Sequence, residues 1–218
     1  MDLTAQLDGH CERIDPSFWS EPVNAITNAA FLIAAIYMWR RSRGLPMAQA
    51  LCVVLFAIGV GSFLFHTYAT TWAAIADVAP IAIYVLLYIF LATRDFWEQN
   101  TLTSLGAVLL FFPYAYATLP LFEMLPILNV SAAYGPVPLL ILIYAIGLRR
   151  RAPETARGLA IGATIILISL TFRSVDMPVC ENLPLGTHFM WHILNGVALG
   201  WMIEVYRRHV LAQPAKQG

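Results

Sequence analysis

Apolar segments long enough to cross a membrane follow one another along nearly the whole of this 218-residue chain. A spanning helix needs roughly 20 mainly apolar residues. The predicted spans are residues 22–40, 47–66, 72–93, 102–120, 132–148, 156–173 and 187–206. The composition agrees, because 12% of the residues are charged, against about 25% in soluble domains. The sequence therefore predicts an all-α integral membrane bundle of seven helices, forming one domain over residues 1–218.

The basic residues are distributed unevenly between the two sides of this predicted bundle. One side carries only Arg13 and Arg173 of the 13 Lys and Arg residues. The other side carries Arg40, Arg41, Arg43, Arg94, Arg149, Arg150, Arg151, Arg157, Arg207, Arg208 and Lys216. Because the basic side normally faces the cytoplasm, we expect an outer or lumenal N-terminal tail (1–21) and a cytoplasmic C-terminal tail (207–218). Residues 1–20 are polar and acidic, so no cleavable signal peptide is expected.

Three histidines and one aspartate lie within or at the ends of these apolar segments. His188 and His192 are four residues apart, so they share one face of a helix. His66 ends the second predicted span, and Asp77 lies early in the third. With the topology above, all four lie at a similar depth in the outer leaflet. Ionisable groups inside a membrane are costly and mark functional sites.

Each of these residues also has an ordinary interpretation. A single histidine at a helix end is usually hydrogen-bonded, and a histidine pair can bind haem. Asp77 alone could be a contact between helices or a proton relay, and Ser62 alone could be a small packing residue. Considered together, His66, His188 and His192 predict a zinc site, because imidazole suits zinc and three protein ligands leave a position for water.

The neighbouring polar residues suggest how such a site would work. Asp77 could act as the general base, because it is the carboxylate placed firmly inside a predicted span. Ser62 lies one turn before His66 and could bond the water or the developing oxyanion. Asn195, three residues after His192, could support the ligands. A hydrolytic site at this depth calls for a membrane lipid as substrate, and no nucleic acid partner is expected.

The segment before the first span combines acids with a helix-start pattern. Ser20, Glu21 and Pro22 are typical of a helix N-terminus, with Ser20 as the N-cap and Glu21 near the positive helix end.

Several motifs together resemble one family. They are Cys11-Glu12, Trp19 to Asn28, Gly59 to His66, Asp77 to Ile81 and His188 to His192. The chain resembles the alkaline ceramidases, within a wider superfamily of seven-span metal-dependent lipid hydrolases and receptors. The resemblance implies zinc on the three histidines, with Ser62 and Asp77 at the catalytic water. It also implies hydrolysis of the amide of ceramide to a sphingoid base and a fatty acid.

The resemblance further implies a calcium ion, which animal members hold before the first span. A hard cation wants several oxygen ligands. Glu12 and Glu21 fall on the family's positions, whereas Gly9 and Ile14 replace acidic or polar residues and His10 could offer only its carbonyl. Asp8, Asp15 or Asn24 could compensate. The alternative is a tail held by ion pairs or by helix capping.

The cysteines add one further expectation. Cys52 lies within a span, where packing is its ordinary role. Cys11 and Cys180 are both assigned to the outer side, where disulfides can form. The resemblance to animal relatives implies a bridge between them, which would pin the tail over the site. Two free thiols are the alternative.

Two other classes of function compete with a lipid amidase. A receptor of the same superfamily, similar to the adiponectin and progestin receptors, would share the three histidines but have its N-terminus inside. A transporter or proton channel would use Asp77 and the histidines as a relay. That function predicts polar groups across the whole bilayer depth, and the inner halves of the predicted spans have few of them.

Overall fold

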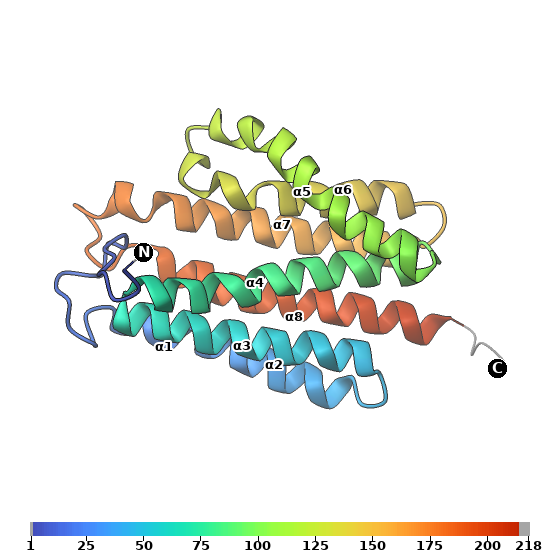
Figure 1. Ribbon diagram of the computed structural model, residues 1–218, viewed down its shortest axis with the longest axis horizontal. Coiled ribbons are helices and arrows are strands. Elements are labelled where there is room, and N and C mark those ends of the chain that lie inside the picture. Colours follow the sequence, from blue (N-terminus) through green and yellow to red (C-terminus); the bar gives the residue numbers. More distant parts are fainter. Residues whose placement is uncertain (1, 214–218) are drawn as a thin grey trace.

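The chain forms an elongated bundle whose long helices run roughly along its longest axis (Figure 1). This computed structural model describes residues 2–213, and within that range it has no strand, only one isolated bridge between Gln6 and Thr70. The helices are α1 (Pro22–Thr27), α2 (Ala29–Arg41), α3 (Pro46–Tyr68), α4 (Thr71–Leu91), α5 (Thr101–Glu123), α6 (Pro136–Leu148), α7 (Pro153–Val175) and α8 (His188–Ala212). A π-helical turn (Ala92–Phe96) continues α4, and two 3₁₀ segments, η2 (Asn129–Tyr134) and η3 (Met177–Val179), precede α6 and follow α7. The all-α prediction is confirmed for the described residues.

Five helical segments are long and apolar enough to cross a membrane. They are Pro22–Arg41, Pro46–Tyr68, Thr71–Phe96, Thr101–Glu123 and Pro153–Val175. The protein is therefore a membrane protein by the length and composition of its helices. Helix α8, with 25 residues, is not among these five. Its last turns carry Glu204, Arg207 and Arg208.

The predicted span 132–148 differs most from the structure. Residues up to Tyr134 belong to a 3₁₀ segment, and α6 begins only at Pro136. Proline is favoured in the first turn of a helix because its missing N–H has no partner there. The 13 residues of α6 rise about 20 Å, which is short of the roughly 30 Å hydrocarbon core. The predicted tail 207–218 also differs, since α8 continues to Ala212; residues 214–218 lie outside the described part of the chain.

The core lies where α2, α3, α4, α7 and α8 pack against one another. Its fully buried side chains include Leu51, Leu55, Leu91, Leu159 and Ile203. Helix α5 lies apart from this core and crosses the others obliquely (Figure 1), and Ser104 is its one buried residue among those described. Its exposed leucines and aromatic side chains suit contact with lipid chains.

The C-terminal end of α3, the N-terminal ends of α4 and α8, and the N-terminal tail lie at one end of the bundle (Figure 1). The tail runs back along the α3–α4 turn. The N–H of Leu7 donates to Ala69 O at 2.7 Å, and the N–H of Thr71 donates to Ala5 O at 3.1 Å. The tail is thus a folded part of this end of the molecule.

Candidate metal centre

Three buried imidazoles meet at this end of the bundle. The ring centroids of His66 and His192 lie 4.6 Å apart, those of His188 and His192 4.8 Å, and those of His66 and His188 5.1 Å. His66 comes from the last turns of α3, and the other two come from the first two turns of α8. All three are almost completely buried, with exposed fractions of 1%, 4% and 0% for His66, His188 and His192. The structure therefore gathers the three histidines on which the sequence-based metal site rests.

Two of these rings are held through Nδ1 in the way that metal ligands usually are. His66 Nδ1 lies 2.6 Å from Glu21 Oε2. A carboxylate only accepts, so Nδ1 carries the hydrogen and Nε2 keeps a free lone pair. His192 Nδ1 lies 3.0 Å from Thr27 Oγ1. Its Nε2 is buried without a hydrogen-bond partner among the described residues. Buried polar atoms normally have a partner, and a free Nε2 opposite a bonded Nδ1 is the usual state of a zinc-binding histidine. The donor set fits zinc.

A fourth imidazole belongs to the same cluster. The ring of His10, from the tail, lies 4.7 Å from that of His66 and 4.1 Å from that of His188 between centroids. Within the described residues, His10, His66 and His188 form the one group of three whose ligand atoms all lie within 4.8 Å of one another. The sequence reasoning gave His10 only a carbonyl role in a calcium site. The structure places its ring among the proposed zinc ligands instead.

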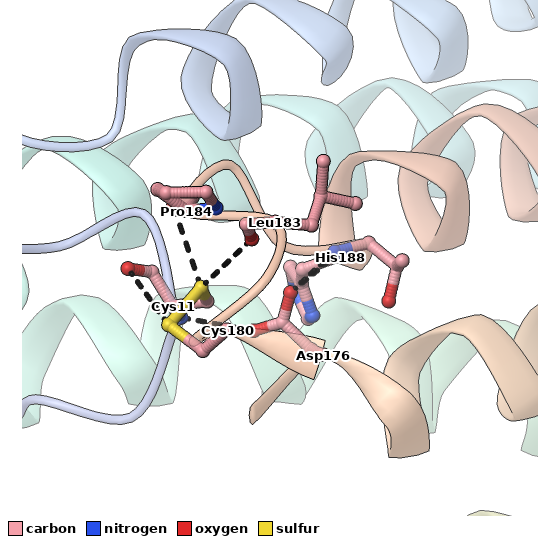
Figure 2. Close-up of a disulfide and its surroundings, with 7 residues drawn as sticks. Cys11, Asp176, Cys180, Leu183, Pro184 and His188 are labelled. Carbon is pink, nitrogen blue, oxygen red and sulfur yellow. Dashed lines mark hydrogen bonds between the residues drawn. A yellow bond between two sulfur atoms is a disulfide. The ribbon is translucent and has the colours of Figure 1, made fainter. Parts of the chain in front are cut away.

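Asp176 and a disulfide anchor the start of α8 to the tail (Figure 2). Asp176 Oδ1 accepts the N–H groups of Thr187 and His188 at 2.7 and 2.9 Å, and Oδ2 accepts the N–H of Cys11 at 3.0 Å. Cys11 and Cys180 are bridged, with 5.4 Å between their Cα atoms. The carboxylate thus satisfies amides at the N-terminus of α8, and it fixes His188 relative to the tail.

Glu21 makes polar contacts with four other side chains, one of which is His66. Arg13 Nε donates to Glu21 Oε1 at 2.6 Å, and Asn24 Nδ2 and His10 Nδ1 lie 3.1 and 3.2 Å from Oε2. Burial by itself raises the pKa of Glu21, but the contacts with His10 and His66 outweigh it and hold the pKa well below its usual range. Glu21 is therefore a charged group inside a network of donors.

Glu12 has a different partner set. Its two oxygens accept the N–H groups of Val23 and Asn24, both at 2.8 Å. Glu12 therefore satisfies the first amides of α1, and burial raises its pKa. Ser20 was expected to be the N-cap, but its hydroxyl accepts from Ile14 and Asp15 instead. The N-cap position belongs to Glu21.

Of the residues expected for calcium, Glu12, Glu21, His10 and Asn24 lie close together, whereas Asp8 and Asp15 lie outside this group. Asp8 and Asp15 are exposed, and Asp15 Oδ1 accepts the N–H of Ser17 at 2.8 Å. The Arg13 guanidinium forms an ion pair with Glu21. The carboxylate that a calcium ion would need is therefore already paired with a positive charge. These contacts match the alternative of a tail held by ion pairs and capping.

Ser62 and Asp77 line one cavity, and Phe31, whose ring centroid lies 6.3 Å from that of His192, forms part of its wall. Asn195, Tyr134 and Trp191 line it as well. Gly61 makes the approach of α3 and α4 possible, because a Cβ there would overlap Ala76 O and come within 3.2 Å of Asp77 Cα. Asn195 Nδ2 donates to Ser169 Oγ at 3.0 Å, which fixes its carboxamide. The structure therefore brings together the three polar residues expected near the metal.

A second, almost wholly apolar cavity lies next to the first, toward the other end of the bundle. The two share the lining residues Val85, Val137, Ile166 and Leu199. The second is lined further by Tyr84, Tyr88 and Tyr144. Tyr84 and Tyr88 donate their hydroxyls to Leu199 O and Met202 O at 2.8 and 3.0 Å. Their polar ends are thus paired with backbone, and the second cavity offers an apolar wall beside the cavity that Asp77 lines.

Sequence reasoning missed four residues around the centre: the ring of His10, Arg13, Thr27 and Asp176. Thr27 and Asp176 could not be found from spacing, since they contact His192 and Cys11 from 165 positions away. Arg13 was considered only as one of the basic residues that indicate the orientation in the membrane. The sequence did offer one indication for His10: it precedes Cys11, and a disulfide at Cys11 also fixes the position of the neighbouring residue.

The comparisons with known proteins agree with this geometry. A search among curated proteins finds no match. A protein-family model described as Ceramidase matches residues 7–217, nearly the whole chain. The matched range contains each residue of the histidine cluster as well as Ser62, Asp77 and the bridged cysteines. The chain belongs to the ceramidase family.

Proposed function

We propose that this protein is a zinc-dependent amidohydrolase that cleaves ceramide, or a closely related N-acyl sphingoid lipid, into a sphingoid base and a fatty acid. Membership of the ceramidase family supports ceramide hydrolysis in general. The observation that carries the finer proposal is the free, buried Nε2 of His192 beside His66 and His188.

His66, His188 and His192 would hold the zinc ion. Bound there, zinc supplies Lewis-acid activation of water and of the amide carbonyl. Glu21 and Thr27 hold two of the rings through Nδ1, so they would leave Nε2 of each ring free to bind the zinc ion. Asp176 fixes the backbone at His188 by accepting its N–H.

Asp77 would take the proton of the attacking water and return it to the departing amine of the sphingoid base. Its place in the cavity wall beside Ser62 supports this role. The Ser62 hydroxyl would bond the water or the oxygen that gains charge as the amide is attacked. Asn195, held by Ser169, would keep the polar end of the substrate in register.

The substrate's acyl chain would lie in the apolar cavity between α4, α6, α7 and α8, next to the cavity that Asp77 lines. Its lining, which includes Val85, Ile141, Leu199 and Met202, offers almost entirely apolar contacts. Burying each methylene there contributes about 0.8 kcal/mol. A long acyl chain is therefore the expected partner.

The active site would face the outer or lumenal side, with the N-terminal tail there and the C-terminus in the cytoplasm. The positive-inside count supports this orientation. The Cys11–Cys180 bridge supports it too, because disulfides persist in oxidising compartments. A proton-relay function is less well supported. The buried hydroxyls of Tyr84 and Tyr88, which such a relay would use, already donate to backbone carbonyls.

Metal analysis together with lipid hydrolysis tests the proposal. Purified protein should carry about one zinc per chain and release fatty acid from long-chain ceramide. A variant with His66, His188 and His192 all changed to Ala should lose both properties. A His209→Ala variant is the matched control, because His209 contacts Thr155 and Asp95 at the other end of the bundle. Full zinc content in the triple variant would overturn the metal assignment. Normal zinc without hydrolysis would favour the receptor alternative.

A further inference from the structure

His10 repeats the arrangement of a proposed zinc ligand. Its Nδ1 lies 3.2 Å from Glu21 Oε2, the same oxygen that lies 2.6 Å from His66 Nδ1. One carboxylate oxygen therefore lies close to the Nδ1 atoms of two imidazoles. Glu21 accepts from His66 Nδ1. A hydrogen on His10 Nδ1, facing the same carboxylate, would leave the Nε2 lone pair of His10 free as well.

The position of His10 is fixed relative to His188 from two directions. The next residue, Cys11, is bridged to Cys180 and donates its N–H to Asp176. The same carboxylate accepts the N–H of His188 (Figure 2). Gly186 has a positive φ of 63°, and a Cβ there would overlap Asp176 Oδ1 and lie 2.7 Å from Cys11 Cβ. The absence of a side chain at this position lets the tail approach the start of α8.

Burial and backbone structure also distinguish His10 from the other three rings. Its side chain is 12% exposed, whereas His66, His188 and His192 are between 0% and 4% exposed. It also lies on the one segment of the cluster that is not helical. His10 is therefore the ring of the four that lies nearest to solvent, on a segment without regular structure.

We propose that His10 is a fourth imidazole ligand of the zinc ion, supplied by the N-terminal tail, and that its ring holds the position that water or substrate must take. This inference rests on the proposed zinc centre at His66, His188 and His192. Four nitrogens complete a tetrahedral zinc site, whereas a catalytic site needs an open position. The resting centre is then closed, and it opens when His10 gives way to the substrate.

X-ray absorption at the zinc edge of the purified full-length protein tests this directly, because it counts the imidazoles around the metal. The wild-type protein should show four imidazole nitrogens, and His10→Ala should show three with an added oxygen. The zinc affinity of His10→Ala, measured by competition with a chelator, should fall by at least about 10-fold, the lower end for loss of a group that supports a zinc site. His209→Ala should match the wild type in both measurements.

The outcomes separate this inference from the proposed function. Wild-type protein without zinc would overturn the metal centre itself. Wild-type protein with zinc on three imidazoles and an oxygen would overturn only the role of His10, whether or not the His10→Ala variant folds. Cobalt in place of zinc gives a second readout, since its visible absorption differs between four nitrogens and a centre that has bound water. Identical cobalt spectra for wild type and His10→Ala would also contradict the proposal.

Discussion

Arg13 and Glu21 form an ion pair from which water is almost completely excluded. Arg13 Nε lies 2.6 Å from Glu21 Oε1, and the two side chains are 3% and 1% exposed. Arg13 also donates from its terminal nitrogens to Asp15 O at 3.0 Å and to His66 O at 3.1 Å. The pair therefore ties the tail to the end of α3, and it balances the charge of the carboxylate that orients His66.

Loss of Arg13 should destabilise the protein strongly. Arg13→Ala leaves the buried Glu21 carboxylate without its ion-pair partner, and breaking a buried pair in this way costs about 3–5 kcal/mol. The matched control is Arg157→Ala, whose pair with Glu154 is 72% and 82% exposed and should contribute less than about 1 kcal/mol. Unfolding in detergent, followed by tryptophan fluorescence, measures both. Equal losses for the two variants would contradict a structural role for the Arg13–Glu21 pair.

Calcium should neither bind to the tail nor activate the enzyme. Arg13 already supplies the positive charge beside Glu21, and both oxygens of Glu12 are bonded to the amides of α1. Calorimetric titration of the zinc-loaded protein with calcium should give no binding heat, and a calcium-selective chelator should leave turnover unchanged. Binding heat that disappears in Glu12→Gln would show that the family's calcium site is kept here.

Replacement of Asp77 should remove turnover but leave the metal in place. Asp77→Asn keeps the shape of the side chain and loses its basic oxygen, so the rate of ceramide hydrolysis should fall by roughly 100-fold or more. The zinc content should stay as in the wild type, because Asp77 lies in the cavity wall and not in the histidine cluster. Glu154→Gln, at an exposed carboxylate far along the bundle, serves as control. A normal rate in Asp77→Asn would make Asp77 a structural residue.

Gly61 should be intolerant of even a methyl group. In Gly61→Ala the new Cβ would overlap Ala76 O, so α3 and α4 must separate and Ser62 must move away from Asp77. We expect lower thermal stability and lower turnover together. Gly106→Ala in α5 is the matched control, because no atom lies within 4 Å of its Cβ position. There alanine should be neutral or stabilising by up to about 1 kcal/mol, owing to its better helix propensity.

The orientation in the membrane can be tested at two exposed positions. Cysteines introduced at Asp8, in the tail, and at Arg43, between α2 and α3, would be treated with an impermeant thiol reagent on intact cells. The positive-inside rule predicts labelling at position 8 without permeabilisation, and at position 43 only after it. The reverse pattern would move the histidine cluster to the cytoplasmic side, as in the receptors.

The sequence alone determined the helical class, the membrane location and the residues that meet at one end. Apolar length is a local property that can be read directly from residues such as those of α3 and α4. The His188–His192 spacing is also local, and one helical period was enough to place both residues on one face of a helix. The closeness of His66 to the short turn before Asp77 is local in the same way. Their ring-to-ring distances follow that expectation.

Only the tertiary structure decided what the tail does and where α6 begins. Arg13, Thr27 and Asp176 contact partners between 8 and 165 positions away, and helical periodicity cannot specify contacts made between elements. The same holds for His10, whose ring reaches His66 and His188 because a disulfide and the shared Asp176 carboxylate draw the tail onto α8. Hydrophobic pattern records which residues avoid water, whereas pairing of buried polar groups depends on which donors and acceptors the folded chain brings within about 3 Å.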